Sequence, residues 1–561
     1  MRHREPKSLA RMFDKRNRTP WRSRAQSRYD GSGKVSIGHA GWPALEKMAE
    51  LVNARRYGGR VGNERGGRYS GRFWLPLQET EHVGGWLDLS GARPILELAE
   101  PLTPALREAS RTASPDGSVS TQWQLADDDL QPAGLTVHGI LRGAASRRVT
   151  LVGAITVGRQ QAGGPVRDPG EQRLRAEYVL LGGHRTGADA VFTEARLRLR
   201  HLDAWAQLPG VEVQVVEDRF HVTILYEAPE AETAEVPGLA GRLVLDNTAE
   251  ATMPTVQGAS VAQTAELRLE VPAGMTLDVL WRRFVSPLAV LLTLAVGTYC
   301  PPVGVDVYSQ EEGCWLEVRR PELKEPADNL LDVHEVLLTR FDLGVGHLAA
   351  WLDAAPALRP IPSLVAEVAT APARTLANQL LQMAIAAEGL HRRLRPNERV
   401  MSLGQADKAR RLGRDAVPDE VRQRVNDALL HLEEPTYAER LRFLTGLVRE
   451  AVPGATGDTE KWESRIKAVR NGFAHQVVPR ADAASVADDS EWHEYFVLLR
   501  TLRWVLTGAV LLQTGLEPAR LGGRVQQHEP YRFLLRQAQR WLPDLYTASR
   551  PPPADANGPS D

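Results

Sequence analysis

The segment EKWESRIKAVRNGFAHQVV, residues 460–478, decides the fold of the C-terminal half of this 561-residue chain. At 100° per residue, four apolar side chains of the segment fall within about 60° of one another on a helix. They are Trp462, Ile466, Val469 and Phe473. Such a stripe is typical of an amphipathic helix that packs one face against a core, so the segment predicts a helix within an α-helical domain.

The polar residues of the same helix are expected to lie off its buried face. Asn471 and His475 fall on the side turned away from the apolar stripe, and Arg470 lies on its flank. The bare Arg-x4-His spacing carries no weight, because 61 Arg and 14 His residues produce about 1.5 such pairs by chance. The chain has two, and the other, Arg196 to His201, lies in an alternating run that is typical of a strand. Arg470 and His475 can also be ordinary surface residues of a solvated helix face without a function, and this alternative stays open.

Arg470 and His475 together carry groups that can cleave RNA without a metal. Histidine, with an ordinary pKa of about 6.5, exchanges protons at neutral pH, and a guanidinium donates a fork of hydrogen bonds to phosphate oxygens. These properties suit proton transfer at the ribose 2′-hydroxyl and the leaving 5′-oxygen, and stabilisation of the phosphorane between them. Five positions apart, the two side chains lie about 140° apart around the helix. We therefore expect two copies of the helix to share one cleft, in a homodimer.

The N-terminal half of the chain has a different periodicity. Over residues 73–319, short apolar-alternating runs are broken by Gly, Pro and Asp, which predicts a β-rich antiparallel domain. Within it, residues 86–99 predict two strands, residues 211–227 a hairpin that turns at Glu217–Asp218, and residues 277–296 a helix.

A charged linker with prolines, residues 320–330, precedes a change to helical periodicity over residues 331–545. Short polar loops separate most of the candidate helices, which indicates a bundle of antiparallel neighbours. The candidate helices are residues 330–352, 363–394, 420–432, 437–451, 459–478, 491–514 and 531–541. The predicted fold class is multidomain α+β, with a β-rich antiparallel domain followed by an all-α bundle.

Both ends of the chain are expected to lie outside these domains. Residues 1–72 hold 18 Lys or Arg against 6 Asp or Glu, with Gly-rich stretches, which predicts a basic, disordered leader. Residues 546–561 predict a disordered tail. The whole chain has a net charge of −1, so no global field marks it as a nucleic-acid binder.

The cysteine content and the apolar runs point to the cytoplasm. Cys300 and Cys314 are the only cysteines, too few for a disulfide scaffold or a four-cysteine zinc site. The longest apolar run, residues 287–297, is about half of the ~20 residues that a membrane span needs. Walker, HExxH, CxxC and GxSxG motifs do not occur in the sequence. We therefore expect a cytoplasmic protein with no membrane span, no metal and no cofactor.

Several segments resemble one family of phage-defence proteins. Arg470–His475, RNGFAH, is similar to the RN-x-x-x-H form of the Arg-x4-6-His motif of HEPN domains. FWLPL at 73–77, HGILRGAASRRVTLVGA at 138–154 and LDAWA at 202–206 resemble the β-rich domain that precedes the HEPN domain in ApeA-type abortive-infection proteins. The resemblance covers most of residues 73–545.

This resemblance implies a helical, dimeric and metal-independent endoribonuclease that is activated by a phage-derived molecule. Its substrate would be RNA, with tRNA as one candidate. By position, the resemblance makes Arg470 and His475 catalytic and Asn471 the polar residue that follows the Arg. Glu388, in AIAAEGLHRRL, would be the acidic residue that faces the motif from an earlier helix, although a helix-surface charge explains it equally well.

Two other functions remain open at this point. A HEPN helix pair without catalysis would make the chain an adaptor that acts by dimerisation or nucleic-acid docking. A β-rich domain can also recognise a carbohydrate or a protein, but the 13 Trp residues are spread along the chain and are more typical of core packing.

Overall fold

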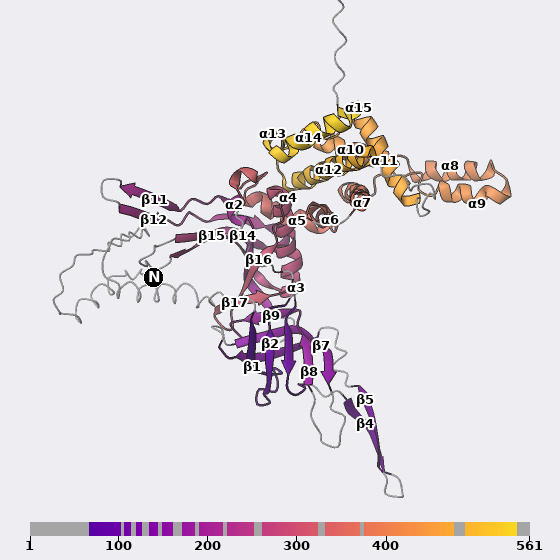
Figure 1. Ribbon diagram of the computed structural model, residues 1–561. Coiled ribbons are helices and arrows are strands. Elements are labelled where there is room, and N and C mark those ends of the chain that lie inside the picture. The colour runs from indigo at the N-terminus through magenta and orange to yellow at the C-terminus, as the bar shows by residue number, and fades with distance from the viewer. Residues whose placement is uncertain are drawn as a thin grey trace, which may run out of the picture. The chain divides into compact units, whose positions relative to one another are not determined.

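The computed structural model shows an antiparallel β-rich region followed by helices, which confirms the predicted fold class (Figure 1). The structure describes residues 67–91, 93–102, 106–113, 119–125, 134–143, 148–160, 171–185, 190–216, 221–251, 261–321, 323, 331–370, 375–475 and 489–546. Most of the predicted leader, most of the linker and nearly all of the tail lie outside the described residues. Within the stretch assigned to the leader, residues 68–72 form the beginning of strand β1.

The chain divides into two compact units. The smaller includes residues 209–229, and its β11 (Val211–Val216) and β12 (His221–Tyr226) form an antiparallel hairpin, as the alternation predicts. The predicted turn at Glu217–Asp218 lies outside the described residues. The larger unit contains all the sites discussed below.

Six antiparallel strands of the larger unit close into a barrel. The strands pair in the order β7, β6, β1, β2, β3 and β8, and β8 pairs again with β7. Leucine, valine and phenylalanine side chains fill the interior. Gly139 on β6 is needed there, because a Cβ at this position would lie 2.5 Å from the Phe73 ring. The barrel strands are β1 (Arg68–Trp74), β2 (Val83–Asp88), β3 (Ile95–Leu98), β6 (Leu135–Leu141), β7 (Arg148–Gln160) and β8 (Glu171–Arg175).

The same sheet continues beyond the barrel through β9 and ends at β13. One face of this extension is covered by a largely apolar helical stretch, α3, η4 and α4, where the sequence predicts one helix. The further strands are β9 (Tyr178–Leu181), β17 (Cys314–Arg319), β16 (Pro302–Ser309), β10 (Val191–Leu199), β15 (Val261–Thr276), β14 (Gly241–Ala251) and β13 (Glu232–Val236), with β4 (Leu106–Ala113) and β5 (Val119–Leu125) as a separate hairpin. The helices of this region are α2 (Leu202–Ala206), α3 (Leu277–Leu280), η4 (Trp281–Val285) and α4 (Ser286–Val296).

Helices make up the C-terminal region. Three of them begin at Thr or Ser residues whose side chains accept a hydrogen bond from the backbone of the first turn, namely Thr375, Ser402 and Thr436. The elements are η5 (Val333–Glu335), α5 (Val345–Leu358), α6 (Ile361–Thr370), α7 (Leu376–Leu394), α8 (Leu403–Asp415), α9 (Asp419–Ala428), α10 (Tyr437–Val448), α11 (Thr459–His475), α12 (Asp489–Leu511), η6 (Leu512–Thr514), α13 (Pro518–Gln527), α14 (Glu529–Trp541) and α15 (Pro543–Tyr546).

Some predicted helix boundaries are wrong. The run 330–352 is not one helix, since only η5 and α5 form there. The run 363–394 contains two helices, α6 and α7, and residues 371–374 between them lie outside the described residues. Three helices were not predicted: α8, α13 and the four-residue α15. In α8 only Ala406 is buried, so the helix shows no apolar stripe in the sequence.

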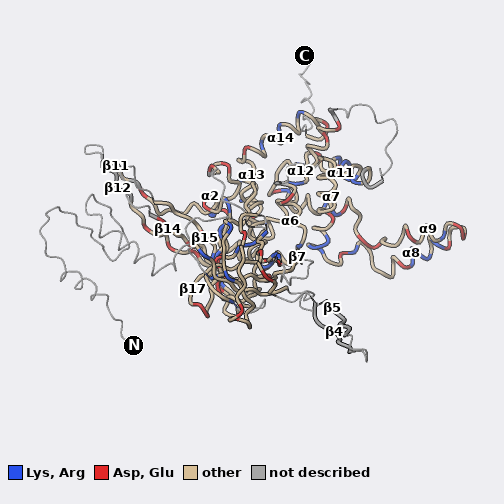
Figure 2. The backbone as a smooth tube through the Cα atoms, turned by 60° about the horizontal axis from the view of Figure 1, so that its bottom comes forward, with Lys and Arg blue, Asp and Glu red and all other residues tan. Residues whose placement is uncertain are grey.

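Two helical stretches, Leu277–Val296 and Glu491–Thr514, are long and apolar enough to cross a membrane by length and composition. Their apolar windows are 61% and 67% buried by the rest of the protein, as in the core helices of soluble proteins. Basic and acidic residues are interspersed over strands and helices (Figure 2), in keeping with the near-zero net charge.

Candidate active site on the helical bundle

Helix α11 places the predicted site residues by burying one of its faces. The helix begins after Asp458, whose carboxylate accepts a hydrogen bond from the backbone N–H of Lys461, and this bond lowers the pKa of Asp458. Trp462 and Ile466 are fully buried, and the indole N–H of Trp462 donates to the hydroxyl of Thr501 on α12 at 3.0 Å. With this face fixed, Arg470 lies half-buried at the edge of the bundle.

Two helices distant in sequence hold the guanidinium of Arg470. Its Nη2 donates to Oε2 of Glu388 on α7 at 2.9 Å. Its central carbon lies 4.7 Å from the ring centroid of Tyr437, the first residue of α10. The side chains of Arg470 and Glu388 keep 32% and 26% of their surface exposed, so the pair is oriented and still open to solvent.

The ring of Tyr437 is a fixed surface against which the guanidinium of Arg470 packs. Thr436 and Glu439 form a reciprocal capping box that begins α10 at this residue. The Tyr437 hydroxyl donates to the backbone oxygen of Ala384 on α7 at 3.2 Å. Burial raises the pKa of Tyr437, so the ring stays neutral at physiological pH.

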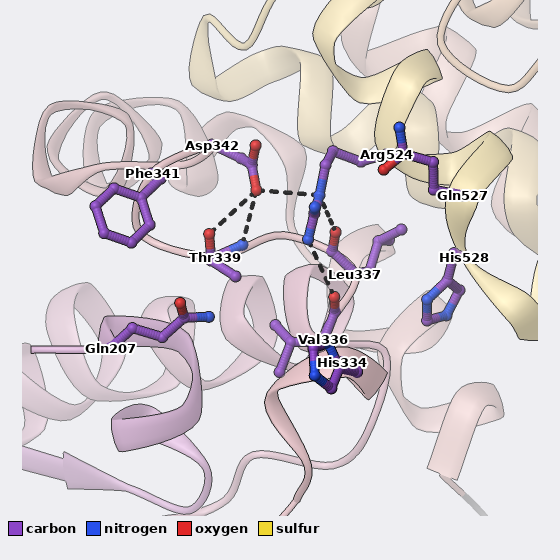
Figure 3. Close-up of a pocket in the computed structure, with 10 residues that line it drawn as sticks. All are labelled: Gln207, His334, Val336, Leu337, Thr339, Phe341, Asp342, Arg524, Gln527 and His528. Carbon is purple, nitrogen blue, oxygen red and sulfur yellow. Dashed lines mark hydrogen bonds and ion pairs between the residues drawn. The ribbon is translucent and has the colours of Figure 1, made fainter.

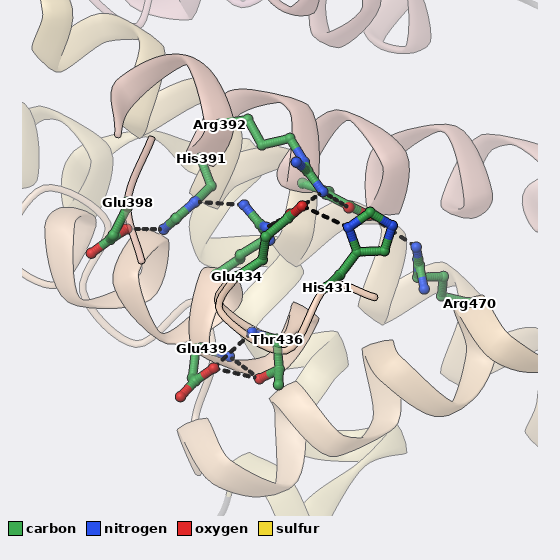
Figure 4. A network of polar contacts seen from close by, with 10 residues as sticks. His391, Arg392, Glu398, His431, Glu434, Thr436, Glu439 and Arg470 are labelled. Carbon is green, nitrogen blue, oxygen red and sulfur yellow. Dashed lines mark hydrogen bonds and ion pairs between the residues drawn. The ribbon is translucent and has the colours of Figure 1, made fainter. Parts of the chain in front are cut away.

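Glu388 also belongs to a chain of ion pairs that runs away from Arg470 (Figure 4). Its Oε1 lies 3.3 Å from Arg392, and Arg392 lies 2.8 Å from Glu434. Glu434 pairs in turn with Arg440 at 2.9 Å, and Arg440 reaches Nδ1 of His391 at 3.2 Å. The chain therefore ties α7, α10 and the residues just before α10 into one polar network behind Arg470.

His391 closes the network inside the protein. Its ring is 2% exposed and its Nε2 lies 3.0 Å from Glu398. Burial lowers the pKa of His391, and the neighbouring Arg440 lowers it further. Nδ1 then accepts from Arg440 and Nε2–H donates to Glu398. His391 thus has a structural position, one turn beyond Glu388 but away from the exposed edge.

The end of α11 carries the rest of the predicted motif. Asn471 is half-buried, and among the described residues no atom lies within 4 Å of a Cβ added at Gly472. His475 is the last residue of the helix, and its side chain lies outside the described residues, as do those of Phe473 and Ala474. The structure thus brings Arg470 and Glu388 together, and the geometry between Arg470 and His475 stays a prediction.

The second Arg-x4-His pair has structural contacts. Arg196 lies on β10, with its guanidinium 3.8 Å from the ring centroid of Trp315 and 3.3 Å from Glu266. His201 lies beyond the strand in a left-handed conformation at the start of α2. The sequence predicts that this pair lies on a strand, and the structure confirms this for Arg196.

Comparison with protein families agrees with this architecture. Residues 68–340 match the family ApeA N-terminal domain 1, and residues 381–519 match the family Apea-like HEPN. The chain is an ApeA-type protein with a C-terminal HEPN domain. These two domains fit an anti-phage effector with a nuclease-type HEPN domain, and HEPN domains are generally ribonuclease-like. Neither the curated proteins nor the solved structures gave a match.

Within the HEPN domain, the sequence did not point to three residues of the Arg470 environment: Tyr437, Arg392 and Glu434. The capping box at Thr436 and Glu439 marks the start of α10, so the place of Tyr437 on its first turn could be expected. That its ring would lie under Arg470 could not, because the contact joins residues of two separate helices. No group of three His, Cys, Asp or Glu residues is arranged to hold a metal within the described part of the chain.

Proposed function

We propose that this ApeA-type protein is a cytoplasmic, metal-independent endoribonuclease that arrests phage-infected cells by cleaving RNA. The observation that carries the proposal is the partly exposed Arg470 guanidinium, held between Glu388 and Tyr437 on the HEPN helix α11. This arrangement fixes a positive charge at the bundle edge without burying it. The RNA target is open, with tRNA as one candidate.

The chemistry follows from the side chains of the motif. The ribose 2′-hydroxyl loses its proton and attacks the adjacent phosphorus, and the 5′-oxygen leaves with a proton. His475 is the proton-transfer group, and Arg470 stabilises the charge that develops on the phosphorane oxygens. The products are a 2′,3′-cyclic phosphate and a 5′-hydroxyl. Because Arg470 and His475 lie about 140° apart around α11, each cleft of a homodimer takes its Arg470 from one copy of the helix and its His475 from the other.

Glu388 positions Arg470 for this reaction. A carboxylate at 2.9 Å restricts the rotamers of the guanidinium, and the ring of Tyr437 restricts its plane. The pair remains accessible, so phosphate oxygens can approach the guanidinium donors that Glu388 does not use. Gly472 has no side chain, and no described residue lies within 4 Å of its Cβ position, so it lets the RNA backbone or the partner helix come close.

Expression in a bacterial host with and without phage tests the proposal. Wild-type protein should slow growth or block plaque formation on infection, and Arg470→Ala and His475→Ala should abolish protection while accumulating to the wild-type level. Arg449→Ala, which changes an exposed arginine at the end of α10, is the control and should protect normally. If either site variant protects as well as the wild type, the site is wrong.

The adaptor alternative makes a different prediction for the purified protein. An adaptor would bind RNA with an affinity that falls as salt rises, and would leave the RNA intact. An endoribonuclease cuts the RNA in EDTA and leaves cyclic phosphate ends.

A further inference from the structure

A cavity of about 420 Å³ lies where the end of the N-terminal domain meets helix α13 (Figure 3). One wall is Gln207, which follows α2, and another is the segment 334–342 that leads into α5. The third wall is the end of α13 together with His528. All three walls belong to the larger compact unit. The cavity lies within the range of about 300–1,000 Å³ in which small-molecule sites fall, toward its lower end.

The charge of the cavity comes from Arg524. Its Nε donates to the backbone oxygen of Leu337 at 3.1 Å and lies 3.2 Å from Asp342, and its Nη2 lies 3.5 Å from the backbone oxygen of Val336. Among the described residues these contacts engage Nε and Nη2, which leaves Nη1 as a donor for a ligand. Among the described residues that line the cavity, Asp342 is the one acidic residue, and Arg520 also holds it at 3.6 Å. Two guanidiniums, Arg524 and Arg520, thus face one carboxylate, and this charge balance favours an anion.

Imidazole and amide groups complete one side of the cavity. Figure 3 shows His528 and Gln527 on the side opposite Phe341, with His334 below Arg524. Burial, with Arg524 and Arg503 nearby, lowers the pKa of His528, so its ring is a neutral hydrogen-bonding group at physiological pH. Such groups and a guanidinium can together bind phosphate oxygens.

The other side offers a fixed aromatic surface. Phe341 is 61% exposed. One face of its ring is covered by the guanidinium of Arg340 at 4.6 Å, and Arg340 is held by the backbone oxygen of Ala206 at 2.7 Å. Gln207 lies on the same side of the cavity (Figure 3). A flat ring with hydrogen-bonding edges can stack on Phe341 and bond to this amide.

We propose that this cavity binds a mononucleotide, with the base stacked on Phe341 beside Gln207. The phosphate is bound by the groups on the opposite side, Arg524, Gln527, His528 and His334. The aromatic surface and the anion-binding groups lie at opposite sides of one cavity, as the two ends of a nucleotide require. The site is separate from the Arg470 edge, and because it joins the N-terminal domain to α13, its ligand stabilises that contact. The proposal does not depend on RNA cleavage.

Isothermal titration of the full chain with AMP, GMP, CMP and UMP tests the site, with adenosine and inorganic phosphate as separate arms. We expect at least one nucleotide to bind with one molecule per chain, and its nucleoside and free phosphate to bind at least about tenfold more weakly. Phe341→Ala and Gln527→Ala should each weaken binding at least about fivefold. The matched controls Phe533→Ala and Gln526→Ala, both exposed and outside the lining, should bind as the wild type does.

Three results would overturn the proposal: no nucleotide binds, the nucleoside or phosphate alone binds as tightly, or the controls weaken binding as much as Phe341→Ala. Arg470→Ala separates this site from the proposed active site. It should bind the nucleotide normally, and if it abolishes binding while Phe341→Ala does not, the nucleotide occupies the RNA site and this proposal fails while the proposed function stands.

Discussion

At the scale of single residues, the orientation of Arg470 depends on two contacts that come from elsewhere in the chain. Glu388 lies 82 positions away and Tyr437 belongs to a third helix. The helix phase predicted that Arg470 would lie on the flank of α11, and Trp462 and Ile466 are buried as that phase requires. Contacts between helices depend on how the helices pack, which periodicity within one helix does not determine.

Replacing Glu388 by Gln should lower kcat about tenfold or more with little change in KM, because the guanidinium loses its fixed orientation. The ion pair is partly exposed, so the free energy of unfolding should change by no more than about 1 kcal/mol. Steady-state cleavage of a labelled RNA and thermal melting measure the two effects. Glu460→Gln, an exposed charge on the first turn of α11, is the control. Unchanged kcat in Glu388→Gln would show that Glu388 is only a surface charge.

Tyr437 should act through its ring. Tyr437→Phe keeps the surface under Arg470 and loses one hydrogen bond, so it should retain most activity and lose about 1 kcal/mol of stability. Tyr437→Leu removes the cation–π contact and should reduce cleavage about tenfold. The comparison uses cleavage rates and chemical denaturation of both variants. Equal rates in the Phe and Leu variants would contradict a role for the ring.

At the scale of secondary-structure elements, the strands were predicted better than the helices. Alternating runs such as residues 86–99 and 211–227 became β2, β3, β11 and β12, because one face of each strand is apolar. Helix α8 buries one residue and so gives no such signal. The closure of the barrel by β7 and β8 could not be predicted, since it depends on long-range pairing.

Replacing Gly472 near the end of α11 should raise the stability of the helix and lower RNA cleavage. Gly472→Ala adds a methyl group that contacts none of the described residues, and it should stabilise the helix by about 1 kcal/mol. We expect cleavage to fall, because that space admits the RNA or the partner helix. Gly446→Ala on α10, also open at its Cβ, should gain stability and keep its activity. Full activity in Gly472→Ala would show that nothing approaches the helix there.

The network between α7 and α10 should make the protein less stable in acid. Because burial lowers the pKa of His391 in the folded state, the unfolded chain binds more protons below its ordinary pKa, and stability falls as the pH drops through about 6.5. His391→Gln removes this titration and keeps an acceptor and a donor. Urea denaturation at pH 7.5 and 5.5 measures the loss of unfolding free energy in acid. This loss should be smaller for His391→Gln than for the wild type. The exposed His334→Gln is the control and should lose as much as the wild type. Parallel losses in all three proteins would contradict a buried neutral His391.

At the scale of the whole molecule, the N-terminal sheet and the helical region share one hydrophobic core. The core runs from β10 and β15 through α4 and α5 to α7, α11 and α12. One continuous set of packed side chains therefore joins the ApeA domain to the HEPN helices. Cysteine content and the short apolar runs predict a compartment, and the missing motifs argue against several enzyme classes, but only the folded chain shows this continuity.

The most direct test mixes two inactive variants in EDTA. Purified Arg470→Ala and His475→Ala should each leave RNA uncut. In exchanged heterodimers, one cleft regains an intact Arg470 and an intact His475, so about a quarter of wild-type activity should return, with 2′,3′-cyclic phosphate ends. Cleavage by either variant alone at the wild-type rate, or products without cyclic phosphate, would contradict the account.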